Sequence, residues 1–490
     1  MRPILFDNTY AALPERFYQR IHPENAPKPE LIRVNAALAE QFNLDIDWLR
    51  SADGVDMFAG SRLPESSQPI AMAYAGHQFG GLSPQLGDGR AHLIGELIDC
   101  HGVRFDVHLK GSGRTAFSRR GDGKAALGPV LREYIVSEAF AALGIPATRT
   151  LAAVLTGEQV IRDTGVPGAV LTRMAQSHVR VGTFQYFAIR NDREGVTLLA
   201  DYVIGRHFPE LRQAENPYLA LLESVALRQA GLIAQWMGVG FIHGVMNTDN
   251  MQVVGETIDF GPCAFMDRFH PDKVFSAIDA AGRYAWNRQS RMGKWNLARL
   301  AEALLPLIDA DQAKAIVAAE GVLAQFSDVF HNHYVSIFSA KLGLAADESN
   351  EAFIRQTLKI MADNEVDFTL FFRQLTRISQ GSEEGDLLAL FASAEAGRQW
   401  LAQWRQSLAD RPDRPDREAA VKLMTRSNPI YIPRNHRVEQ VIDQANRGNF
   451  APFHELVDLL ARPFDEQPGF EAYELPPEPH EEVQETFCGT

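Results

Sequence analysis

Cysteine is scarce in this sequence of 490 residues, which holds three: Cys100, Cys263 and Cys488. Three cysteines cannot form a disulfide framework, and such low usage is typical of proteins from a reducing compartment. No stretch approaches the roughly 18 consecutive apolar residues that a membrane span requires. Asp7 stands where a signal peptide would have its apolar run. We therefore expect a cytoplasmic protein without a membrane partner.

Positively charged residues are also fewer than negatively charged ones. The 48 Lys and Arg residues against 62 Asp and Glu give a formal net charge of −14. Nucleic-acid-binding proteins need a basic surface to displace counterions, so we expect no nucleic-acid partner. What the chain does have is 46% hydrophobic and 22% charged residues, the composition of a globular protein. The chain is longer than a domain with one hydrophobic core usually is, which predicts two lobes with appendages.

Strand-like and helix-like segments are unevenly distributed along the chain. Gly-rich turns separate short β-type runs between about residues 70 and 175, whereas residues 218–238 and 296–405 have mostly helical apolar spacing. The charged, Pro-broken segment 409–418 predicts a linker, and the acidic residues 474–490 predict an extended tail. The pattern predicts an α+β fold of two unequal lobes with a cleft between them. The expected divisions are an N-terminal extension, a strand-rich N-lobe, a helical C-lobe and a C-terminal extension, at residues 1–65, 66–175, 176–430 and 431–490.

The stretch FIHGVMNTDNMQVVGETIDFGPCAFMD, residues 241–267, concentrates polar side chains around a tight turn. MQVV and TIDF are β-type runs on either side of Gly255-Glu256, which predicts a two-residue hairpin. Such a hairpin would bring Asn250 and Asp259 within reach of one ion, with Asp249 beside them. Oxygen ligands of this kind suit Mg²⁺ when phosphates complete its shell. A polar turn closed by Asx hydrogen bonds explains the same residues, and the stretch alone leaves both interpretations open.

The spacing in this stretch is that of protein kinases, whose catalytic loop H-R-D-x-x-x-x-N precedes a D-F-G sequence. Asn250 follows His243 by seven residues, and Asp259 begins a DFG. Val245, however, stands where a kinase has its catalytic Asp, so Asp249 becomes the candidate base. The pattern predicts a kinase-like frame with chemistry other than that of an ordinary kinase.

Other kinase-like parts precede this stretch in the expected order. Residues 84–97 pattern as a Gly-rich turn and a strand, a geometry in which backbone N–H groups approach phosphates, although a plain hairpin turn also fits. Lys110 ends the next strand, and residues 128–144 predict a helix that carries Glu133 and Glu138. Because these glutamates lie about 140° apart around a helix, only one can face Lys110. A dinucleotide fingerprint at residues 111–116 lacks the apolar helix start that it needs, and no Walker sequence occurs.

Several long segments together closely resemble the selenoprotein O (YdiU) family. They are HGVMNTDNM, TIDFGPCAFMD, GHQFGGLSPQLGDGRAHLIGE, LKGSGRTAFSRRGDGKAALGPVLREYI and TRMAQSHVRVGTFQYF, with further agreement at NPIYIPRNHRVEQVI. The resemblance runs from about residue 70 to residue 290. It implies a protein-kinase-like two-lobed fold that binds ATP in a flipped orientation. It also implies transfer of AMP, with release of pyrophosphate, to hydroxyl side chains of proteins.

The resemblance further implies roles for individual residues. Asp249 would be the catalytic base, and Asn250 and Asp259 would bind magnesium. Nucleotide-site residues would be Gly87, Gly89, Arg90, Lys110, Asp122, Gly123, Glu133, Arg173, Arg180 and Asp259, with Glu133 as the partner of Lys110. A flipped nucleotide places its α-phosphate at the metal and needs further cations, which Arg173, Arg180 and a cluster of Arg114, Arg119 and Arg120 can supply. A solvated basic loop is the plain alternative for that cluster.

Two expectations concern the strength of the base and the cysteines. A Mg²⁺ ion nearby is expected to lower the pKa of Asp249, which would then mainly orient the hydroxyl. Family members carry a Cys or selenocysteine near the C-terminus, where Cys488 lies, and a Cys263–Cys488 disulfide is a hypothesis that follows from the resemblance. Related sequences carry the loop cysteine nearer to Phe275-Ser276, where this chain has none. Cys100 is expected to be a plain buried thiol.

The resulting prediction is an ATP- and Mg²⁺-dependent protein adenylyltransferase that acts on Ser, Thr or Tyr hydroxyls and is expected to be a monomer. Transfer of UMP with Mn²⁺ favoured is an alternative within the same family. A second alternative is a pseudokinase that binds nucleotide without catalysis, which Val245 at the usual base position motivates. A third is an ordinary protein kinase in which Asp249 has taken the role of the base.

Overall fold

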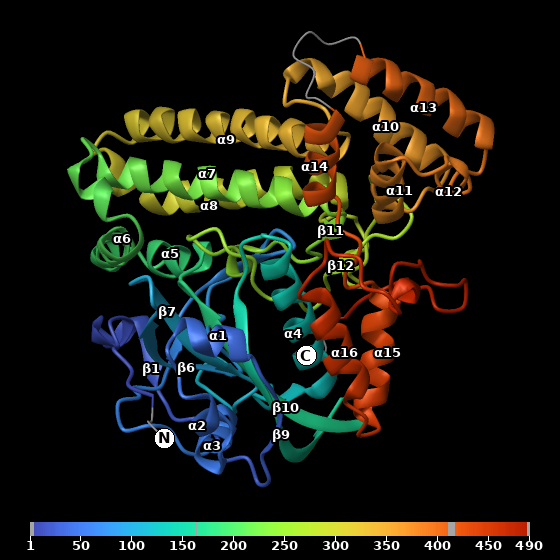
Figure 1. The fold of residues 1–490 in the computed structure, drawn as a ribbon. Coiled ribbons are helices and arrows are strands. Elements are labelled where there is room, and N and C mark those ends of the chain that lie inside the picture. The colour runs from blue at the N-terminus through green and yellow to red at the C-terminus, as the bar shows by residue number, and fades with distance from the viewer. Residues whose placement is uncertain (1–3, 163, 410–416, 488–490) are drawn as a thin grey trace.

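A computed structural model describes residues 4–162, 164–409 and 417–487 of the chain. An antiparallel sheet occupies one half of the molecule, and long helices form the other half (Figure 1). This mixed arrangement confirms the predicted α+β class. Within the described residues, no helix is both long enough and apolar enough to cross a membrane.

Eight antiparallel strands form the main sheet, in the order β1-β3-β6-β7-β10-β9-β2, with β8 paired to β10. Their bounds are β1 Tyr18–Arg20, β2 Glu30–Val34, β3 Ile70–Met72, β6 Ala91–Ile98, β7 Arg104–Lys110, β8 Ala125–Ala126, β9 Arg149–Ile161 and β10 Gly165–Ala175. The runs AHLIGEL, FDVHLK and GAVLTRM are strands, as their sequences predict. Two short hairpin-like pairs stand apart from this sheet, β4 Gly76–Gln78 with β5 Gly81–Ser83, and β11 Phe241–Ile242 with β12 Ala264–Phe265.

Helices cover both faces of the sheet, and this buries its central strands along most of their length. Alternate residues of a strand point to opposite faces. Ala153 and Leu171 accordingly pack with α4, whereas Val154 and Val170 pack with the N-terminal helices. The helices of the sheet half are α1 Ala36–Gln41, α2 Ile46–Arg50, α3 Ala52–Ala59 and α4 Leu127–Ala142.

Helix α4 confirms the helix predicted at residues 128–144. It ends just before Gly144, whose φ of 75° is the left-handed conformation that favours glycine after a helix. One face of α4 packs on the sheet, and α15 and α16 return from the far end of the chain to cover another (Figure 1). α4 is therefore held on both sides, which fixes the direction of every side chain that it carries toward the cleft.

The other half of the molecule is helical, as the apolar spacing of residues 218–238 and 296–405 predicts. In Figure 1, α7, α8 and α9 lie side by side in one layer, and α10 to α14 gather at one end of it. The bounds are α5 Val181–Ala188, α6 Arg193–His207, α7 Pro217–Gly238, α8 Gln289–Ile308, α9 Gln312–Lys341, α10 Glu351–Asp363, α11 Phe368–Gln380, α12 Gly385–Leu388, α13 Ala394–Ala409, α14 Arg417–Ser427, α15 Asn435–Asn446 and α16 Ala451–Leu460. Most of the predicted linker at 409–418 lies outside the described residues.

The hairpin predicted around Gly255-Glu256 is wrong. Residues 251–260 contain no strand, and the two β-type runs pair with different segments instead of with each other. Gln252 bridges Arg180, and Thr257 bridges Ala147 in a parallel sense. The apolar runs are buried by long-range partners, and this tertiary burial outweighs the local preference for a hairpin. Gly255, with φ of 77°, still turns the chain.

The described part of the tail, residues 474–487, contains no regular strand or helix. It nevertheless makes a specific contact near its end, because Thr486 is buried and bridges Ser276. The Thr486 hydroxyl donates to the carbonyl oxygen of Pro262 over 2.6 Å. The tail thus lies against the segment that follows the DFG sequence.

Candidate active site

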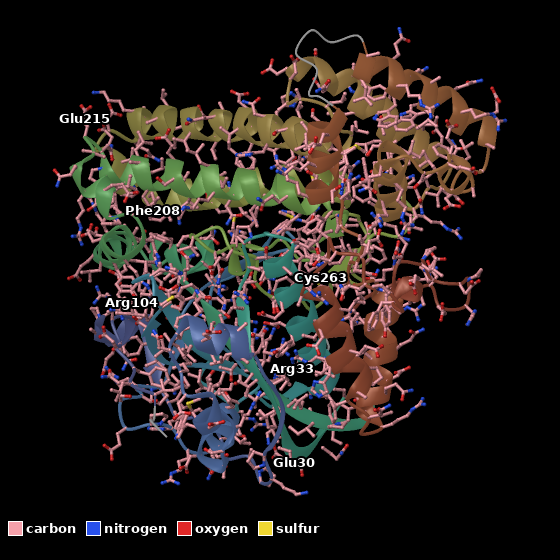
Figure 2. The ribbon with its side chains drawn as sticks, viewed as in Figure 1. Glu30, Arg33, Arg104, Phe208, Glu215 and Cys263 are labelled. Carbon is pink, nitrogen blue, oxygen red and sulfur yellow. The ribbon has the colours of Figure 1, made fainter. Side chains whose placement is uncertain are left out.

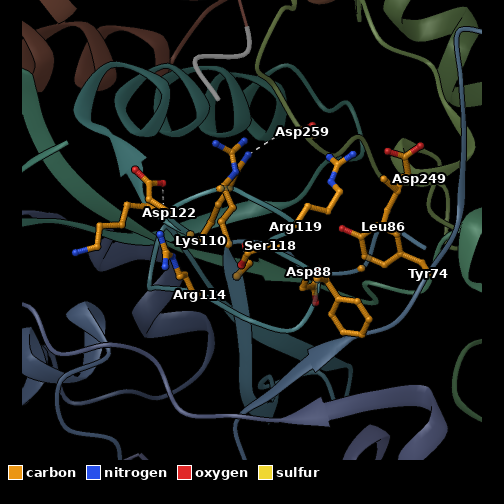
Figure 3. A pocket seen from close by; sticks show the side chains of 18 of the residues that line it. Tyr74, Leu86, Asp88, Lys110, Arg114, Ser118, Arg119, Asp122, Asp249 and Asp259 are labelled. Carbon is orange, nitrogen blue, oxygen red and sulfur yellow. Dashed lines mark hydrogen bonds and ion pairs between the residues drawn. The ribbon is translucent and has the colours of Figure 1, made fainter. Parts of the chain in front are cut away.

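A cavity of about 1000 Å³ lies where the sheet half meets the helical half. Figure 3 shows side chains from both halves converging on it, among them Lys110, Asp122, Asp249 and Asp259. Every residue that the sequence analysis assigned to the site lines this cavity except Glu133, which lies directly behind Lys110. The cavity is also lined by Arg114, Arg119 and Arg120, which are exposed to solvent, so the nucleotide-binding interpretation of this cluster and the solvated basic loop both stay open.

Lys110 is held between two carboxylates at the end of β7. Its ammonium group donates to Glu133 Oε2 over 2.6 Å and to Asp259 Oδ1 over 2.8 Å. The other carboxylate oxygen of Glu133 accepts from Arg173 Nε on β10 over 2.7 Å. Burial opposes ionisation of Glu133, but Arg173 and Lys110 outweigh it and hold the pKa of this carboxyl below its usual value. One buried glutamate therefore positions two cations of the cavity.

The second glutamate of α4 turns away from the site, as its position around the helix predicts. Glu138 accepts from Arg149 and from the backbone N–H of Thr150, at the opposite side of α4 from the cavity. The prediction that only one of the two glutamates can reach Lys110 is confirmed, and that glutamate is Glu133.

Asp259 begins the DFG sequence with an unusual backbone conformation. Its φ of 66° lies in the left-handed region, which residues other than glycine rarely adopt. Burial would raise the pKa of Asp259, but the charges of Lys110, Arg90 and Arg173 hold it far below its usual range. Asp259 is consequently ionised at neutral pH.

Asp249 and Asn250 lie in a single 3₁₀ turn, Thr248–Asn250, on the opposite wall. The side-chain NH₂ of Asn250 donates to the carbonyl oxygen of Val245. The side-chain oxygen of Asn250 therefore points away from Val245. Asp249 Oδ2 accepts from Gln78 over 3.2 Å, and Asp249 Oδ1 is buried with no hydrogen-bond partner among the described residues. Burial raises the pKa of Asp249 to about 6. Burial therefore shifts this pKa in the direction opposite to the shift expected from a nearby cation.

The sequence analysis named Arg180 but missed the buried residues around it, Tyr74, Asp88 and His108, which support the Asp249 loop. Arg180 donates to the carbonyl oxygen of Asp249 over 2.9 Å and stacks over the Tyr74 ring at 4.3 Å from its centre. Asp88 lies 3.5 Å from the Arg180 guanidinium and also contacts His108 at 3.2 Å. Burial opposes ionisation of Asp88, but its contacts with His108 and Arg180 hold its pKa well below the usual range. The only signal in the sequence was an aspartate between two predicted site glycines.

The Gly-rich turn before β6 is tightly packed against the rest of the chain. Gly87 has φ of 70°, and a Cβ on it would lie 2.2 Å from the Phe117 ring. Across the cavity, Gly123 has φ of 72°, and a Cβ there would lie 2.3 Å from the Gly113 backbone. No other residue fits at either position without moving the chain. Next to Gly123, the Asp122 carboxylate accepts from Arg162 over 2.8 Å.

The residues predicted to bind magnesium fit a hard divalent cation by their chemistry. Asp259 supplies a carboxylate that stays ionised, and Asn250 supplies an amide oxygen from the facing wall of the same cavity. Within the part of the chain that the structure describes, no group of three or more His, Cys, Asp and Glu side chains could hold a metal. A site of two protein oxygens is what Mg²⁺ uses when substrate phosphates supply the other ligands.

One of the expectations for the cysteines is wrong. Cys100 is exposed, and the prediction of a buried thiol is wrong because Cys100 lies in the turn between β6 and β7. Cys263 is buried where the two halves of the molecule meet (Figure 2). Burial raises the pKa of its thiol to about 12, and the thiol donates to the Phe260 carbonyl oxygen. Cys488 lies outside the described residues, so the proposed disulfide stays a hypothesis.

Comparisons with known proteins agree with this geometry. Residues 3–461 match the family described as Protein adenylyltransferase SelO. The chain is 58% identical over 489 residues to a protein from Rhodopseudomonas palustris (strain BisB5) named Protein nucleotidyltransferase YdiU, with 99% of each chain covered. Proteins of the same name from Rhizobium etli (strain CIAT 652) and Nitrobacter hamburgensis are 56% and 55% identical over 99% and 100% of this chain and 97% of their own. The chain therefore belongs to the SelO family of protein nucleotidyltransferases.

Proposed function

We propose that this protein transfers AMP from ATP to Ser, Thr or Tyr hydroxyls of other proteins and releases pyrophosphate. The proposal includes a protein-kinase-like frame, with an N-lobe at residues 66–175, a C-lobe at 176–430, extensions at 1–65 and 431–490, and ATP bound in the flipped orientation. We further place the activity in the cytoplasm and expect a monomer.

One observation carries the proposal, namely the distribution of charge within the cavity. Asp249 and Asp259 line the same cavity as Arg114, Arg119 and Arg120, which come from the Gly-rich segment after β7. A flipped nucleotide would place its α-phosphate near Asp249 and Asp259, so that the departing pyrophosphate lies among the arginines. Arginine suits that position because its planar guanidinium binds phosphate oxygens in pairs and keeps its charge.

Different residues would bind the nucleotide and stabilise the charge that develops on it. Glu133 fixes Lys110 and Arg173, so both cations face the phosphates without having to reorganise. Asn250 and Asp259 would hold Mg²⁺, which when bound neutralises phosphate charge and favours attack at phosphorus. Arg180 holds the Asp249 backbone and so fixes the distance between the base and the phosphates.

Asp249 would receive the acceptor hydroxyl. Asp249 lines the cavity, and its Oδ1 has no hydrogen-bond partner among the described residues. The hydroxyl oxygen forms a bond to the α-phosphorus while the bond from that phosphorus to the bridging oxygen breaks. Pyrophosphate leaves with the electron pair, and the proton passes to Asp249. Because its pKa lies near 6, Asp249 is mostly ionised at neutral pH and can accept the proton.

Two matched reactions with MgATP test this function, one labelled at the α-phosphate and the other at the γ-phosphate. Each contains the purified protein and a mixed protein substrate, with an Asp259→Ala variant as control. We expect protein-bound α-label only, and none with the variant. Protein-bound γ-label would show a kinase with Asp249 as its base. ATP binding without transfer of either label would show a nucleotide-binding module. Repeating the reaction with α-labelled UTP and Mn²⁺ separates AMP transfer from UMP transfer.

A further inference from the structure

The β4–β5 hairpin is fixed to the loop that carries Asp249. It is a two-stranded element joined by Phe79 and Gly80, both at positive φ, and so short a hairpin is not stable alone. Contacts with the loop hold it in place. The backbone N–H of His77 donates to the Thr248 hydroxyl over 2.8 Å, and Gln78 donates to Asp249 over 3.2 Å. The hairpin therefore stands at the mouth of the cavity beside the candidate base.

The tip of this hairpin presents apolar side chains to solvent. Phe79 is 38% exposed and Leu82 is 45% exposed. The Phe79 ring packs edge-on against Tyr284, with ring centres 5.2 Å apart, and its backbone N–H lies 3.3 Å from the Asn247 side chain. A φ of 52° is unfavourable for phenylalanine, whereas Asn or Gly would adopt it readily. The geometry of the turn therefore does not explain why an aromatic residue stands at position 79. Contact between the Phe79 ring and a partner would explain it.

An arginine with no carboxylate partner among the described residues lies beside the tip. Arg283 stacks on Trp295, 4.9 Å from the ring centre, and its guanidinium lies within 4 Å of the position of a Cβ on Gly80. Among residues 4–162, 164–409 and 417–487, no carboxylate lies within ion-pair distance of Arg283, and its buried Nε has no hydrogen-bond partner. Arg299 stacks on the same Trp295 ring but pairs with Glu302 at 2.5 Å.

We propose that Phe79, Leu82 and Arg283 form the docking surface for the protein that accepts the nucleotide. The partner it fits is an exposed segment with an apolar side chain and a carboxylate close to the acceptor hydroxyl. The apolar side chain packs on Phe79 and Leu82, and the carboxylate pairs with Arg283, whose aromatic stacking limits the entropy lost on binding. The hydroxyl then reaches Asp249, to which Gln78 links the same hairpin. This surface rests on the proposed function, because it positions an acceptor for that transfer.

A charge-reversal experiment tests the surface. Libraries of Ser, Thr and Tyr peptides with either an acidic or a basic residue near the hydroxyl are incubated with α-labelled ATP. We expect the natural protein to prefer acidic peptides, and Arg283→Glu to lose about tenfold in kcat/KM for them and to gain with basic peptides. Arg299→Gln is the matched control and should keep the natural preference. Phe79→Asn, which suits the positive φ, should raise the KM for peptides about tenfold and leave the KM for ATP within about twofold.

The possible outcomes separate this surface from the function on which it rests. Unchanged peptide preference in Arg283→Glu, with active natural protein, would overturn the docking surface and leave AMP transfer intact. Equal losses in Arg283→Glu and Arg299→Gln would show a structural role for the Trp295 stack and would also overturn it. A change of oligomeric state in Phe79→Asn would assign the hairpin tip to contact between copies of the chain. No α-label transfer by the natural protein would overturn both proposals together.

Discussion

The loops that carry Asp249 and Asp259 place two aspartates on the same cavity, ten residues apart, with opposite properties. Arg180 reaches only the backbone of Asp249 directly, and burial raises the pKa of its side chain to about 6. Lys110 contacts the Asp259 carboxylate, and with Arg90 and Arg173 it holds that pKa far below the usual range. Burial is common to both loops, so the neighbouring cations decide which aspartate is a fixed anion and which can take a proton.

This contrast assigns different tasks to the two carboxylates. A permanently ionised group suits a divalent cation, because its charge is never lost to a proton. A group that titrates near neutrality suits proton transfer. The comparison therefore leads to tests in which the same substitution, Asp to Asn, is made at both positions.

Asp259→Asn should have the largest effect. Loss of the charge removes the carboxylate that would bind Mg²⁺, and we expect AMP transfer to fall by about 10³-fold or more. The check is the initial rate of α-label transfer over a wide range of Mg²⁺ concentrations. A shift of the Mg²⁺ dependence to higher concentration, with part of the rate recovered, would agree with a ligand role. An unchanged Mg²⁺ dependence would contradict it.

Asp249→Asn should lower the rate less, by about 10²-fold, because it removes proton acceptance and leaves the cation site in place. We expect the KM for ATP and the Mg²⁺ dependence to stay close to those of the natural protein. Saturating peptide and ATP are used for the measurement, so that kcat alone is compared. A variant that keeps the full rate under these conditions would remove Asp249 from the base role.

The same two variants should change stability in opposite directions. A carboxyl with a raised pKa in the folded protein lowers stability as the pH rises from about 4 to about 6, because the unfolded chain ionises more easily. Asp249→Asn should thus increase the free energy of unfolding at pH 7, by on the order of 2 kcal/mol. Asp259 contributes stability above pH 4 that is lost as the pH falls, so Asp259→Asn should destabilise at pH 7. Urea unfolding without added metal, at pH 4.5 and at pH 7, measures the change in the free energy of unfolding for each variant. A change of the same sign in both variants would contradict the comparison.

Asp88→Asn should have the smallest effect. Asp88 touches Arg180, not Asp249 itself, so its loss should loosen the position of the base and lower kcat by about tenfold. As a positioning residue, it should change the KM for ATP little. Asp99→Asn, at an acidic residue in the turn between β6 and β7, is the control and should keep the natural kcat. Equal losses of kcat and stability in both variants would indicate a structural role only.

Local parts of the site were predictable from the sequence, and parts made by distant segments were not. The helix with Glu133, the strand ending in Lys110 and the left-handed glycine after α4 each follow from a few adjacent residues. The hairpin at Gly255 failed because its two runs pair with Arg180 and Ala147, more than 70 residues away in one case and more than 100 in the other. The residues that contact Asp249, Gln78 and Arg180, come from other parts of the chain in the same way, as do Tyr74 and Asp88, which contact Arg180.

The measurement that tests the central claim most directly is the product balance of a single reaction with ATP and one purified acceptor protein. Intact mass spectrometry counts the adenylate groups on the acceptor, and a coupled assay counts pyrophosphate and ADP. We predict one pyrophosphate for each adenylate added, no ADP, and neither product with Asp259→Asn. A phosphate-sized mass increase with one ADP for each modification would contradict the account.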